Sequence, residues 1–235
     1  MRKFLIILAG FLLICFGLWR LSVSRTYQLF GELVSRVETN EKIVALTFDD
    51  GPKPDYTEKI LDILKKEGVK ATFFLVGREI RKHSEQAKEI VAHGHELGNH
   101  SFTHHRMIIL GYGQVVREIS DTSDAIREVG YSGPILFRPP YGKKLLVLPY
   151  YLEKIGMPSI TWDLQPESYP EIANDAGRIS RYVVSEARPG SIVLLHVMNK
   201  SRTASIDAVE GLIDGLRKRG YSFVTVSELL KRRGG

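Results

Sequence analysis

Two adjacent carboxylates close an apolar run of the chain and are its strongest indication of chemistry. Asp49 and Asp50 follow the apolar residues 43–48 and precede Gly51 and Pro52. Neighbouring carboxylates repel each other, so a fold that holds both at the end of a buried strand needs a cation to stabilise them. The pair is therefore typical of a metal site in which one carboxylate binds the ion and the other performs acid–base work. The alternative is a solvated turn, since Asp-Asp-Gly-Pro is also favourable loop chemistry.

Two histidines could complete such a site. His100 and His104 are spaced i, i+4, which on a helical turn brings both imidazoles close enough to chelate one ion. Two His and one Asp leave positions open for water and substrate, as expected of a catalytic zinc. The alternative is a pair of surface histidines. His105 would point to a different helical face, and His93 and His95 are expected to be structural.

The elements that must position these side chains alternate between strands and helices. Apolar runs predict strands at residues 43–48, 71–76, 96–99, 135–137, 159–163, 191–196 and 223–226. Helical spacing predicts helices at residues 55–67, 84–93, 114–129, 144–155, 171–187, 204–219 and 227–232. This α/β alternation predicts a parallel sheet with crossover helices and, at about seven repeats, favours a closed barrel.

The candidate polar residues all fall where a predicted strand ends. Besides the Asp pair and His100, the residues Arg138, Asp163 and His196 each close or follow a predicted strand. In barrels of this type the chemistry lies at the carboxyl ends of the strands. Unrelated loop charges would not all select the same end, so this convergence favours a functional site over a solvated turn.

Four short motifs occur in order along the chain. They are Thr47-Phe48-Asp49-Asp50-Gly51, His100-Ser101-x-x-His104, Arg138-Pro139-Pro140-Tyr141 and Leu194-Leu195-His196. These motifs resemble four of the five motifs of the polysaccharide deacetylase family, also called NodB-type or carbohydrate esterase family 4. The resemblance spans residues 43–229.

The resemblance implies a distorted (β/α)7-type barrel that removes acetyl groups from carbohydrate with a divalent metal, usually zinc. Asp50, His100 and His104 would be the metal ligands. Asp49 would be the base that takes a proton from the attacking water, held ionised and oriented by Arg138.

The same resemblance assigns roles to other motif residues. The backbone N–H of Tyr141 would stabilise the oxyanion. His196 would be the acid that protonates the leaving amine. Pro139 and Leu194 would support the substrate groove.

The remaining family motif departs from its usual form, Asp-x-x-Asp-Trp. The corresponding stretch is Trp162-Asp163-Leu164-Gln165-Pro166-Glu167-Ser168-Tyr169, with Ser168-Tyr169 where Asp-Trp is expected. Glu167 or Asp163 could supply the carboxylate that sets the charge of His196, and Tyr169 could form the groove wall. The charge partner of His196 stays open at this point.

The N-terminal segment predicts a membrane-targeting element. Residues 4–19 are almost wholly apolar and follow Arg2 and Lys3, and with residues 21–23 they approach the ~20 residues needed to span a bilayer. A cleaved signal should end in small residues, but Arg20 and Leu21 follow the apolar run here. We therefore favour a single-pass anchor in the cell membrane with the catalytic domain outside; cleavage and secretion are the alternative.

The domain organisation follows from length. Residues 1–23 form the transmembrane anchor or signal segment, residues 24–41 a linker and first strand, and residues 42–235 one catalytic domain. Cys15, the only cysteine, lies in the apolar segment, so the globular part has no thiolate for chemistry. A net charge of +6 suits work beside anionic lipid or wall polymer. The basic residues are dispersed and not interleaved with aromatics, so nucleic acid is not an expected partner.

The expected activity is metal-dependent removal of N-acetyl groups from an N-acetylglucosamine polymer, with release of acetate. Peptidoglycan is the favoured substrate, ahead of chitin-like oligomers, because an outward-facing anchored domain meets wall polymers first. One alternative is an O-deacetylase of acetylated xylan or wall polysaccharide. Another is a carbohydrate-binding protein with a degenerate site. The expected partners are this glycan and, through the N-terminal segment, the lipid bilayer, and the expected state is a monomer.

Overall fold

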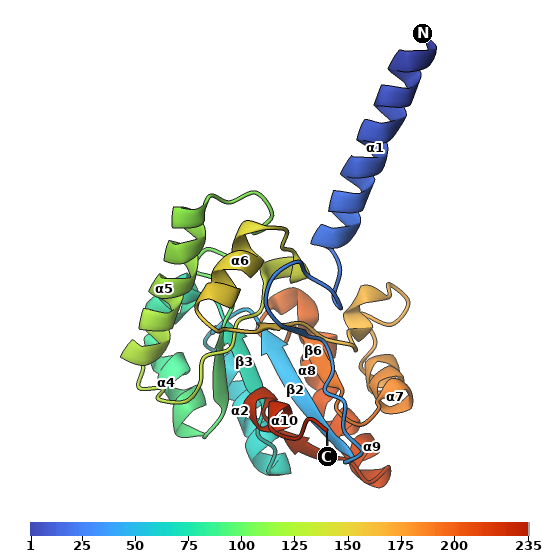
Figure 1. Ribbon diagram of the computed structural model, residues 1–235. Helices are drawn as coiled ribbons and strands as arrows, with labels where there is room; N and C mark the ends of the chain where they lie inside the picture. The colour runs from blue at the N-terminus through green and yellow to red at the C-terminus, as the bar shows by residue number, and fades with distance from the viewer. Residues whose placement is uncertain (235) are drawn as a thin grey trace.

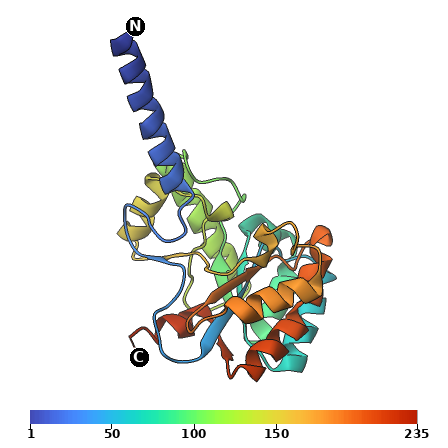
Figure 2. The ribbon, with the colours of Figure 1, turned by 90° about the vertical axis from the view of Figure 1, so that its right-hand side faces the viewer.

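A long N-terminal helix stands out from an otherwise compact chain. The computed structural model describes residues 1–234, so the last residue of the predicted catalytic domain lies outside the described part. Helix α1 (Arg2–Ser22) projects from one end of the domain, and the view turned by 90° shows it leaving from that same end (Figures 1 and 2). It is long and apolar enough to cross a membrane, a test that a signal sequence also passes.

A parallel sheet forms the centre of the domain. Strand β2 (Ile43–Asp49) is buried along its whole length between β3 (Thr72–Leu75) and β6 (Ile192–Leu195). Strand β4 (Glu96–Asn99) extends the sheet beyond β3, and β7 (Ser222–Val224) pairs with the first residues of β2. These strand pairings are all parallel, so the carboxyl ends of the strands meet at one end of the domain.

Isolated bridges continue the pairing around the site. Phe137 bridges Asn99 on one side and Ser159 on the other, and Leu164 bridges Val193 of β6. Strand β5 (Ser159–Ile160) pairs with β1 (Leu33–Val34) in a second, two-stranded sheet. The predicted parallel α/β fold is thus present, but no continuous closed barrel forms among residues 1–234. The region of Phe137 makes only single bridges, partly because Pro139 and Pro140 cannot donate ladder hydrogen bonds.

Helices cover the outside of the sheet, as Figure 1 shows. The longer ones are α2 (Tyr56–Glu67), α4 (Ser84–Ala92), α5 (Tyr112–Glu128), α6 (Val147–Lys154), α7 (Ala176–Glu186) and α9 (Val209–Lys218). The short ones are α3 (Gly77–Lys82), α8 (Thr203–Asp207) and α10 (Val226–Leu230), with single 3-10 turns η1 (Pro140–Gly142), η2 (Pro166–Ser168) and η3 (Lys200–Arg202).

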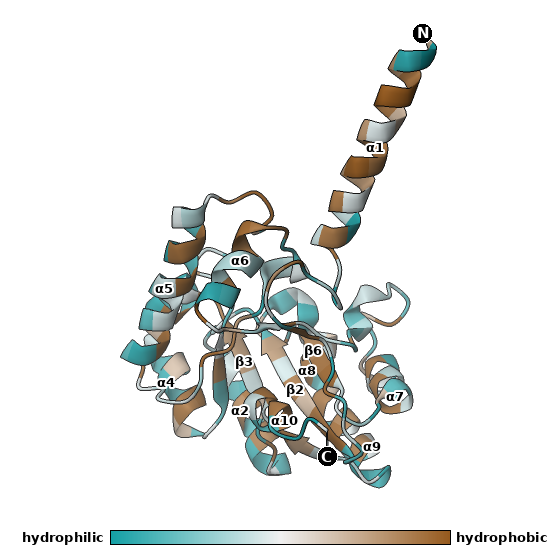
Figure 3. Cartoon of the chain, viewed as in Figure 1, coloured by the Kyte–Doolittle hydropathy of each residue, from teal (hydrophilic) through white to brown (hydrophobic). Residues whose placement is uncertain are grey.

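Local sequence signals account for most of these elements. Helix α2 buries one apolar stripe, including Ile60 and Leu64, and ends at Gly68, whose φ of 60° suits a residue without Cβ. Hydrophobic residues concentrate on the strands and along α1 in Figure 3. Several expectations were wrong in detail. The predicted helix 204–219 is divided into α8 and α9, α3 lies where no helix was predicted, and α7 begins five residues later than expected. The predicted strand 135–137 is only a bridge at Phe137, and the predicted strand 159–163 is confined to residues 159–160.

Candidate active site

Seven of the predicted site residues meet in one cleft at the carboxyl ends of the strands. The cleft measures about 490 Å³. Its lining consists of Asp49, Asp50, His100, His104, Tyr141, Trp162, Gln165, Leu194, His196, Asn199, Ser201 and Arg202. The two Asp residues come from the end of β2 and His196 from the end of β6, so the parallel sheet places them side by side.

Asp49 is held by a buried arginine. Arg138 Nη1 donates to Asp49 Oδ1 at 2.6 Å and to Thr47 Oγ1 at 2.8 Å, and its Nη2 donates to the Thr161 carbonyl at 3.1 Å. Burial raises the pKa of the Asp49 carboxyl, but the charges of Arg138, His100 and His196 outweigh burial and hold the pKa below its usual range. Asp49 is therefore an oriented, ionised carboxylate at neutral pH.

Asp50, His100 and His104 form a three-ligand set. One potential ligand atom from each lies within 4.8 Å of the other two. His104 Nε2 is 3.2 Å from Asp50 Oδ1, and His100 Nε2 is 4.0 Å from the same oxygen. His100 Nδ1 is 2.8 Å from the Arg138 carbonyl, which fixes Nδ1 as the protonated nitrogen and leaves Nε2 turned toward the carboxylates. These donors fit a divalent ion with open positions for water and substrate.

The two histidines converge through a loop, and the expectation of a helical turn was wrong. Residues 100–104 form no helix, and Ser101 and His104 have φ values of 62° and 63°. Asp50 and Tyr141 also have positive φ, 70° and 58°. Non-glycine residues adopt this region at an energetic cost that the surrounding structure must offset, and such residues cluster at functional sites. The left-handed residues turn the chain so that the imidazole centres lie 5.0 Å apart.

Glu167 is the carboxylate that contacts His196. Its Oε2 forms a short hydrogen bond with His196 Nδ1, its Oε1 accepts the His196 backbone N–H at 2.9 Å, and Ser205 Oγ donates to Oε1. Burial lowers the pKa of His196, but the hydrogen bond and charge of Glu167 outweigh burial and raise the pKa to about 9. His196 is therefore a protonated imidazolium at neutral pH.

The comparisons with known proteins place this geometry in a family. The family model described as polysaccharide deacetylase matches residues 36–160, more than half of the chain. A peptidoglycan-N-acetylglucosamine deacetylase of Bacillus cereus is 34% identical over 201 residues, covering 86% of this chain and 94% of the relative. The chain belongs to the polysaccharide deacetylase family.

Other members of the family differ in length and activity. The peptidoglycan-N-acetylmuramic acid deacetylase PdaC of Bacillus subtilis is 36% identical over 193 residues, but the chain spans only 40% of its length. A solved peptidoglycan N-acetylglucosamine deacetylase in complex with a naphthalenyl N-oxidanyl-benzamide is 30% identical, with a TM-score of 0.79 over 85% of this chain and 94% of that one. A pseudoenzyme of carbohydrate esterase family 4 from Bacillus anthracis is 30% identical, with a TM-score of 0.77 over 85% of this chain and 69% of that one.

Tertiary contacts show which residues of the altered family motif contact His196 and which line the cleft. Asp163, the other candidate partner of His196, instead accepts hydrogen bonds from Ser191 Oγ at 2.7 Å and from the Ile192 N–H at 2.8 Å. Tyr169 does not line the cleft, contrary to the expectation of a groove wall, because its ring packs against Tyr182 on α7 at 5.1 Å. Pro139 is buried beside the cleft without lining it, whereas Leu194 does line it.

Several contributors to the site were missed from the sequence of this deacetylase. The indole of Trp162 lies in the cleft wall, although no role was predicted for it. Ser205, on α8, holds Glu167 from a helix 38 residues away along the chain. No sequence signal marks Ser205, because a single serine on a short helix has no distinctive spacing. His93 and His95 match their expected structural interpretation. His93 Nδ1 lies 2.8 Å from the Glu89 carbonyl, His95 Nδ1 accepts the Ala71 N–H at 3.2 Å, and burial lowers the pKa of His95 to about 3.

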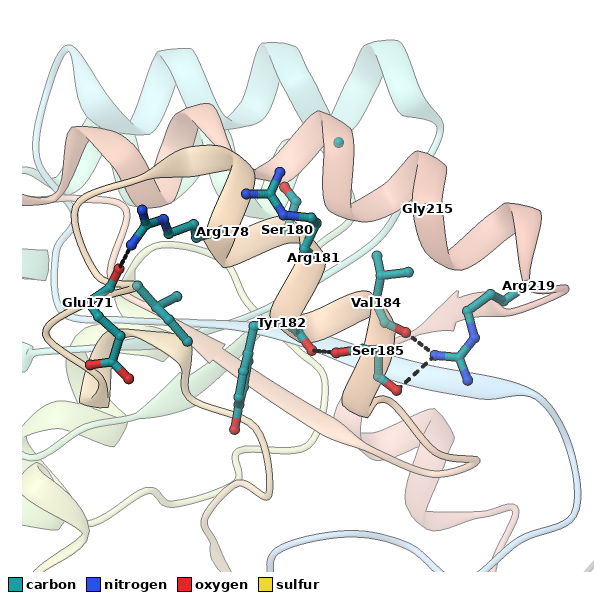
Figure 4. Close-up of a pocket in the computed structure, with 11 residues that line it drawn as sticks. Glu171, Arg178, Ser180, Arg181, Tyr182, Val184, Ser185, Gly215 and Arg219 are labelled. Carbon is teal, nitrogen blue, oxygen red and sulfur yellow. Dashed lines mark hydrogen bonds between the residues drawn. The ribbon is translucent and has the colours of Figure 1, made fainter.

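A larger hollow of about 730 Å³ lies away from this chemistry, between α7 and α9 (Figure 4). Two of its three arginines are directed to backbone carbonyls: Arg178 donates to Glu171 at 2.9 Å, and Arg219 donates to Val184 and Ser185. Its lining residues, all within the described part of the chain, include one carboxylate and no histidine. The candidate active site is therefore the smaller, polar cleft.

Proposed function

We propose that the chain hydrolyses N-acetyl groups of an N-acetylglucosamine-containing glycan, with peptidoglycan as the favoured substrate, and releases acetate. The observation that carries this proposal is the pairing of two groups of opposite role in one cleft. Asp49 is held ionised by Arg138, and His196 is held protonated by Glu167. A base and an acid with pKa values pushed apart are what amide hydrolysis requires.

A divalent ion, which we expect to be zinc, would be held by Asp50, His100 and His104. The fit rests on the convergence of three donor atoms and on the orientation of His100 by the Arg138 carbonyl. When bound, the ion would polarise the acetyl carbonyl and make a nearby water more acidic.

The protein's own side chains would then handle the protons. Asp49 would accept a proton from the attacking water, since the Arg138 charge keeps the carboxylate ionised and its hydrogen bond orients it. The Tyr141 N–H would face the developing oxyanion; the ring of that residue lies 4.7 Å from that of His104, which holds η1 against the metal ligands. His196 would give its proton to the departing amine, which cannot leave as an anion.

The choice of substrate is supported by the relatives. The Bacillus cereus and Bacillus subtilis proteins are described as peptidoglycan deacetylases. A bifunctional xylanase/deacetylase of Pseudobutyrivibrio xylanivorans is 36% identical over 196 residues, and the chain covers 31% of it. An O-deacetylase of xylan or wall polysaccharide is therefore the second candidate, since the same chemistry serves esters.

The cellular setting is part of the proposal. We infer that α1 anchors the protein in the cell membrane as a single pass, with the catalytic domain outside and acting as a monomer. The length and apolar composition of α1 support this placement.

Acetate release tests the proposal. The purified full-length protein is incubated with peptidoglycan, chitooligosaccharide and acetylated xylan, each with zinc and with a chelator. We expect chelator-sensitive release from the two N-acetylated substrates. Release from xylan alone would select the O-deacetylase alternative. If no substrate releases acetate but the protein still binds glycan, the alternative of a carbohydrate-binding protein replaces the proposed enzyme.

A further inference from the structure

The C-terminal end of α1 and the residues that follow it, residues 22–25, are held against the catalytic domain; we call them the foot of α1. The Lys144 N–H donates to the Ser22 carbonyl at 3.1 Å, and Lys144 Nζ donates to the Ser24 carbonyl. Thr161 Oγ1 donates to the Arg25 carbonyl at 2.6 Å. Lys144 is only 1% exposed, so its amine is buried in this contact. The helix therefore joins the domain through a docked segment, with no free linker between them.

This docked segment reaches the wall of the catalytic cleft. The Arg25 guanidinium carbon lies 5.9 Å from the centre of the Trp162 ring, and Trp162 lines the cleft. Residues 23–25 are all that separate the end of α1 from this contact. At roughly 3.5 Å per residue they span at most about 10 Å. The cleft thus lies close to the point where α1 ends.

Helix α1 is too short to hold the catalytic domain away from the membrane surface. Its 21 residues extend for roughly 32 Å at 1.5 Å per residue. The hydrocarbon core of a bilayer is about 30 Å thick. If α1 crosses this core, its whole length lies within the bilayer. The catalytic domain then begins directly at the level of the lipid headgroups.

Exposed apolar side chains occur at the same end of the domain. Tyr27 is 57% exposed, Ile109 89% and Leu146 46%. Tyr27 and Leu146 each lie two residues beyond a docking residue, Arg25 and Lys144. Ile109 belongs to the loop that joins β4 to α5, and this loop reaches the level of the foot of α1 in Figures 1 and 2. We call Tyr27, Ile109 and Leu146 the membrane-facing rim.

The composition of this region suits a lipid interface. Aromatic and aliphatic side chains are favoured at the boundary between hydrocarbon and water. Arg20 and Arg25 flank the end of α1, where basic side chains are attracted by anionic headgroups. No other end of the described domain is continuous with an apolar helix of this length.

We propose that the membrane-facing rim rests on the membrane crossed by α1, so that the catalytic cleft lies at the lipid surface. The consequence for the substrate rests on the proposed function. The glycan would be deacetylated while it is held at the membrane, as a glycan joined to lipid is, and not deep within finished wall polymer.

Fluorescence quenching in a bilayer tests the placement without any enzyme assay. The full-length protein carrying Cys15→Ala, with no other cysteine, is reconstituted into nanodiscs of phosphatidylethanolamine and phosphatidylglycerol that contain nitroxide-labelled lipid. An environment-sensitive fluorophore is attached in the Ile109→Cys variant. The matched control is Ser222→Cys, an exposed position at the opposite end of the sheet, where Ser222 pairs with Ile43.

The two labels should behave oppositely. We expect the Ile109→Cys label to lose most of its emission and the Ser222→Cys label to lose none. Equal emission from both labels, whether quenched or not, would overturn the proposal, because the catalytic end would then have no preferred contact with lipid. A matching thermal melt of both variants confirms that the fold is retained.

A spacer variant tests the consequence for the substrate. Seven helix-forming residues inserted between Arg20 and Leu21 would lengthen α1 by about 10 Å and keep the docking of residues 22–25. We expect acetate release from a lipid-linked acetylated glycan in the same membrane to fall, and release from soluble chitooligosaccharide to stay unchanged. Equal loss or equal retention on both substrates would overturn the membrane-held substrate. If neither protein acts on soluble oligomer, the proposed function fails, while the quenching result still decides the placement.

Discussion

The two sides of the catalytic cleft are built in different ways. On the side of the proposed metal ligands, Asp49 ends a continuous strand, Asp50 follows it, and Arg138 holds Asp49 from a neighbouring loop. On the acid side, His196 also ends a strand, but its charge depends on Glu167 in a 3-10 turn and on Ser205 in a short helix. The family model matches residues 36–160 and so ends before all three of these residues.

This difference indicates that the residues that hold the base and the residues that hold the acid in a proton-transfer site can vary independently. Metal binding demands fixed ligand types at fixed positions, because a wrong donor loses the ion. Charging a histidine demands only a buried carboxylate at Nδ1, and more than one backbone position can supply it. In this chain the altered motif still supplies a carboxylate to His196, from Glu167.

Loss of a proposed metal ligand should have the largest effect on acetate release and should affect only the side of the cleft that binds the ion. We expect His104→Ala to lose bound metal and to lower acetate release roughly 10⁴-fold or more, because several kcal/mol of transition-state stabilisation depend on the ion. Metal content by mass spectrometry and acetate release check this. His105→Ala is the matched control, since His105 is exposed and contacts Thr103. A metal-free variant with full activity would contradict the ligand assignment.

Breaking the buried ion pair should show on stability. Arg138→Met leaves the Asp49 carboxylate buried without its partner, and such a loss costs about 3–5 kcal/mol. A urea melt at neutral pH measures the change in free energy of unfolding. Arg232→Met, which removes an exposed pair with Glu41, should cost less than about 1 kcal/mol. Similar losses in the two variants would mean that the buried pair is not special.

Removal of the acid should affect turnover and leave the metal in place. We expect His196→Ala to lower kcat by about 10²- to 10⁴-fold, the usual contribution of a general acid. Metal content should match that of the unaltered protein, because His196 is outside the three-ligand set. Metal loss in this variant would show that the two sides are not separable.

The pH dependence should follow Glu167. With the pKa of His196 raised to about 9 by Glu167, the protonated acid is lost only above pH 9, and activity falls on that alkaline limb. In Glu167→Gln the charge is gone and burial lowers the pKa, so the limb should move down by at least about one pH unit. Rate profiles between pH 6 and 10 measure this. Asp163→Asn is the matched control and should leave the limb in place, because Asp163 contacts Ser191 and Ile192.

The same group links stability to pH in a definite direction. The folded pKa of His196 lies above its ordinary value of 6.5. Its contribution to stability is therefore complete below pH 6.5 and is lost as the pH rises through about 9. Thermal melts across this range should show a smaller alkaline loss for Glu167→Gln than for the unaltered protein. An unchanged alkaline loss would remove Glu167 as the cause.

The smallest effect should come from the hydroxyl behind Glu167. Ser205→Ala removes one hydrogen bond to the carboxylate and should cost about 1 kcal/mol, or roughly fivefold in kcat. Ser180→Ala, which loses a bond to the Ala208 carbonyl away from the cleft, should leave kcat unchanged. Equal kcat for both variants would limit Ser205 to a structural role.

The sequence alone predicted the candidate metal ligands and the parallel fold. Adjacent Asp residues after an apolar run, paired histidines and polar residues at strand ends are local signals, and parallel strands bring their carboxyl ends together wherever they occur. The spacing also marked α1 as apolar along its length. These features depend on residues near one another in sequence.

Only the tertiary structure decided the contacts between distant segments. It selected Glu167 over Asp163, turned Tyr169 toward α7 and brought the histidines together through a loop with positive φ. It also docked the foot of α1 beside the cleft. The physical reason is that partner choice depends on side-chain direction and burial after the chain has folded, and neighbouring residues of similar chemistry carry no sequence signal that distinguishes them.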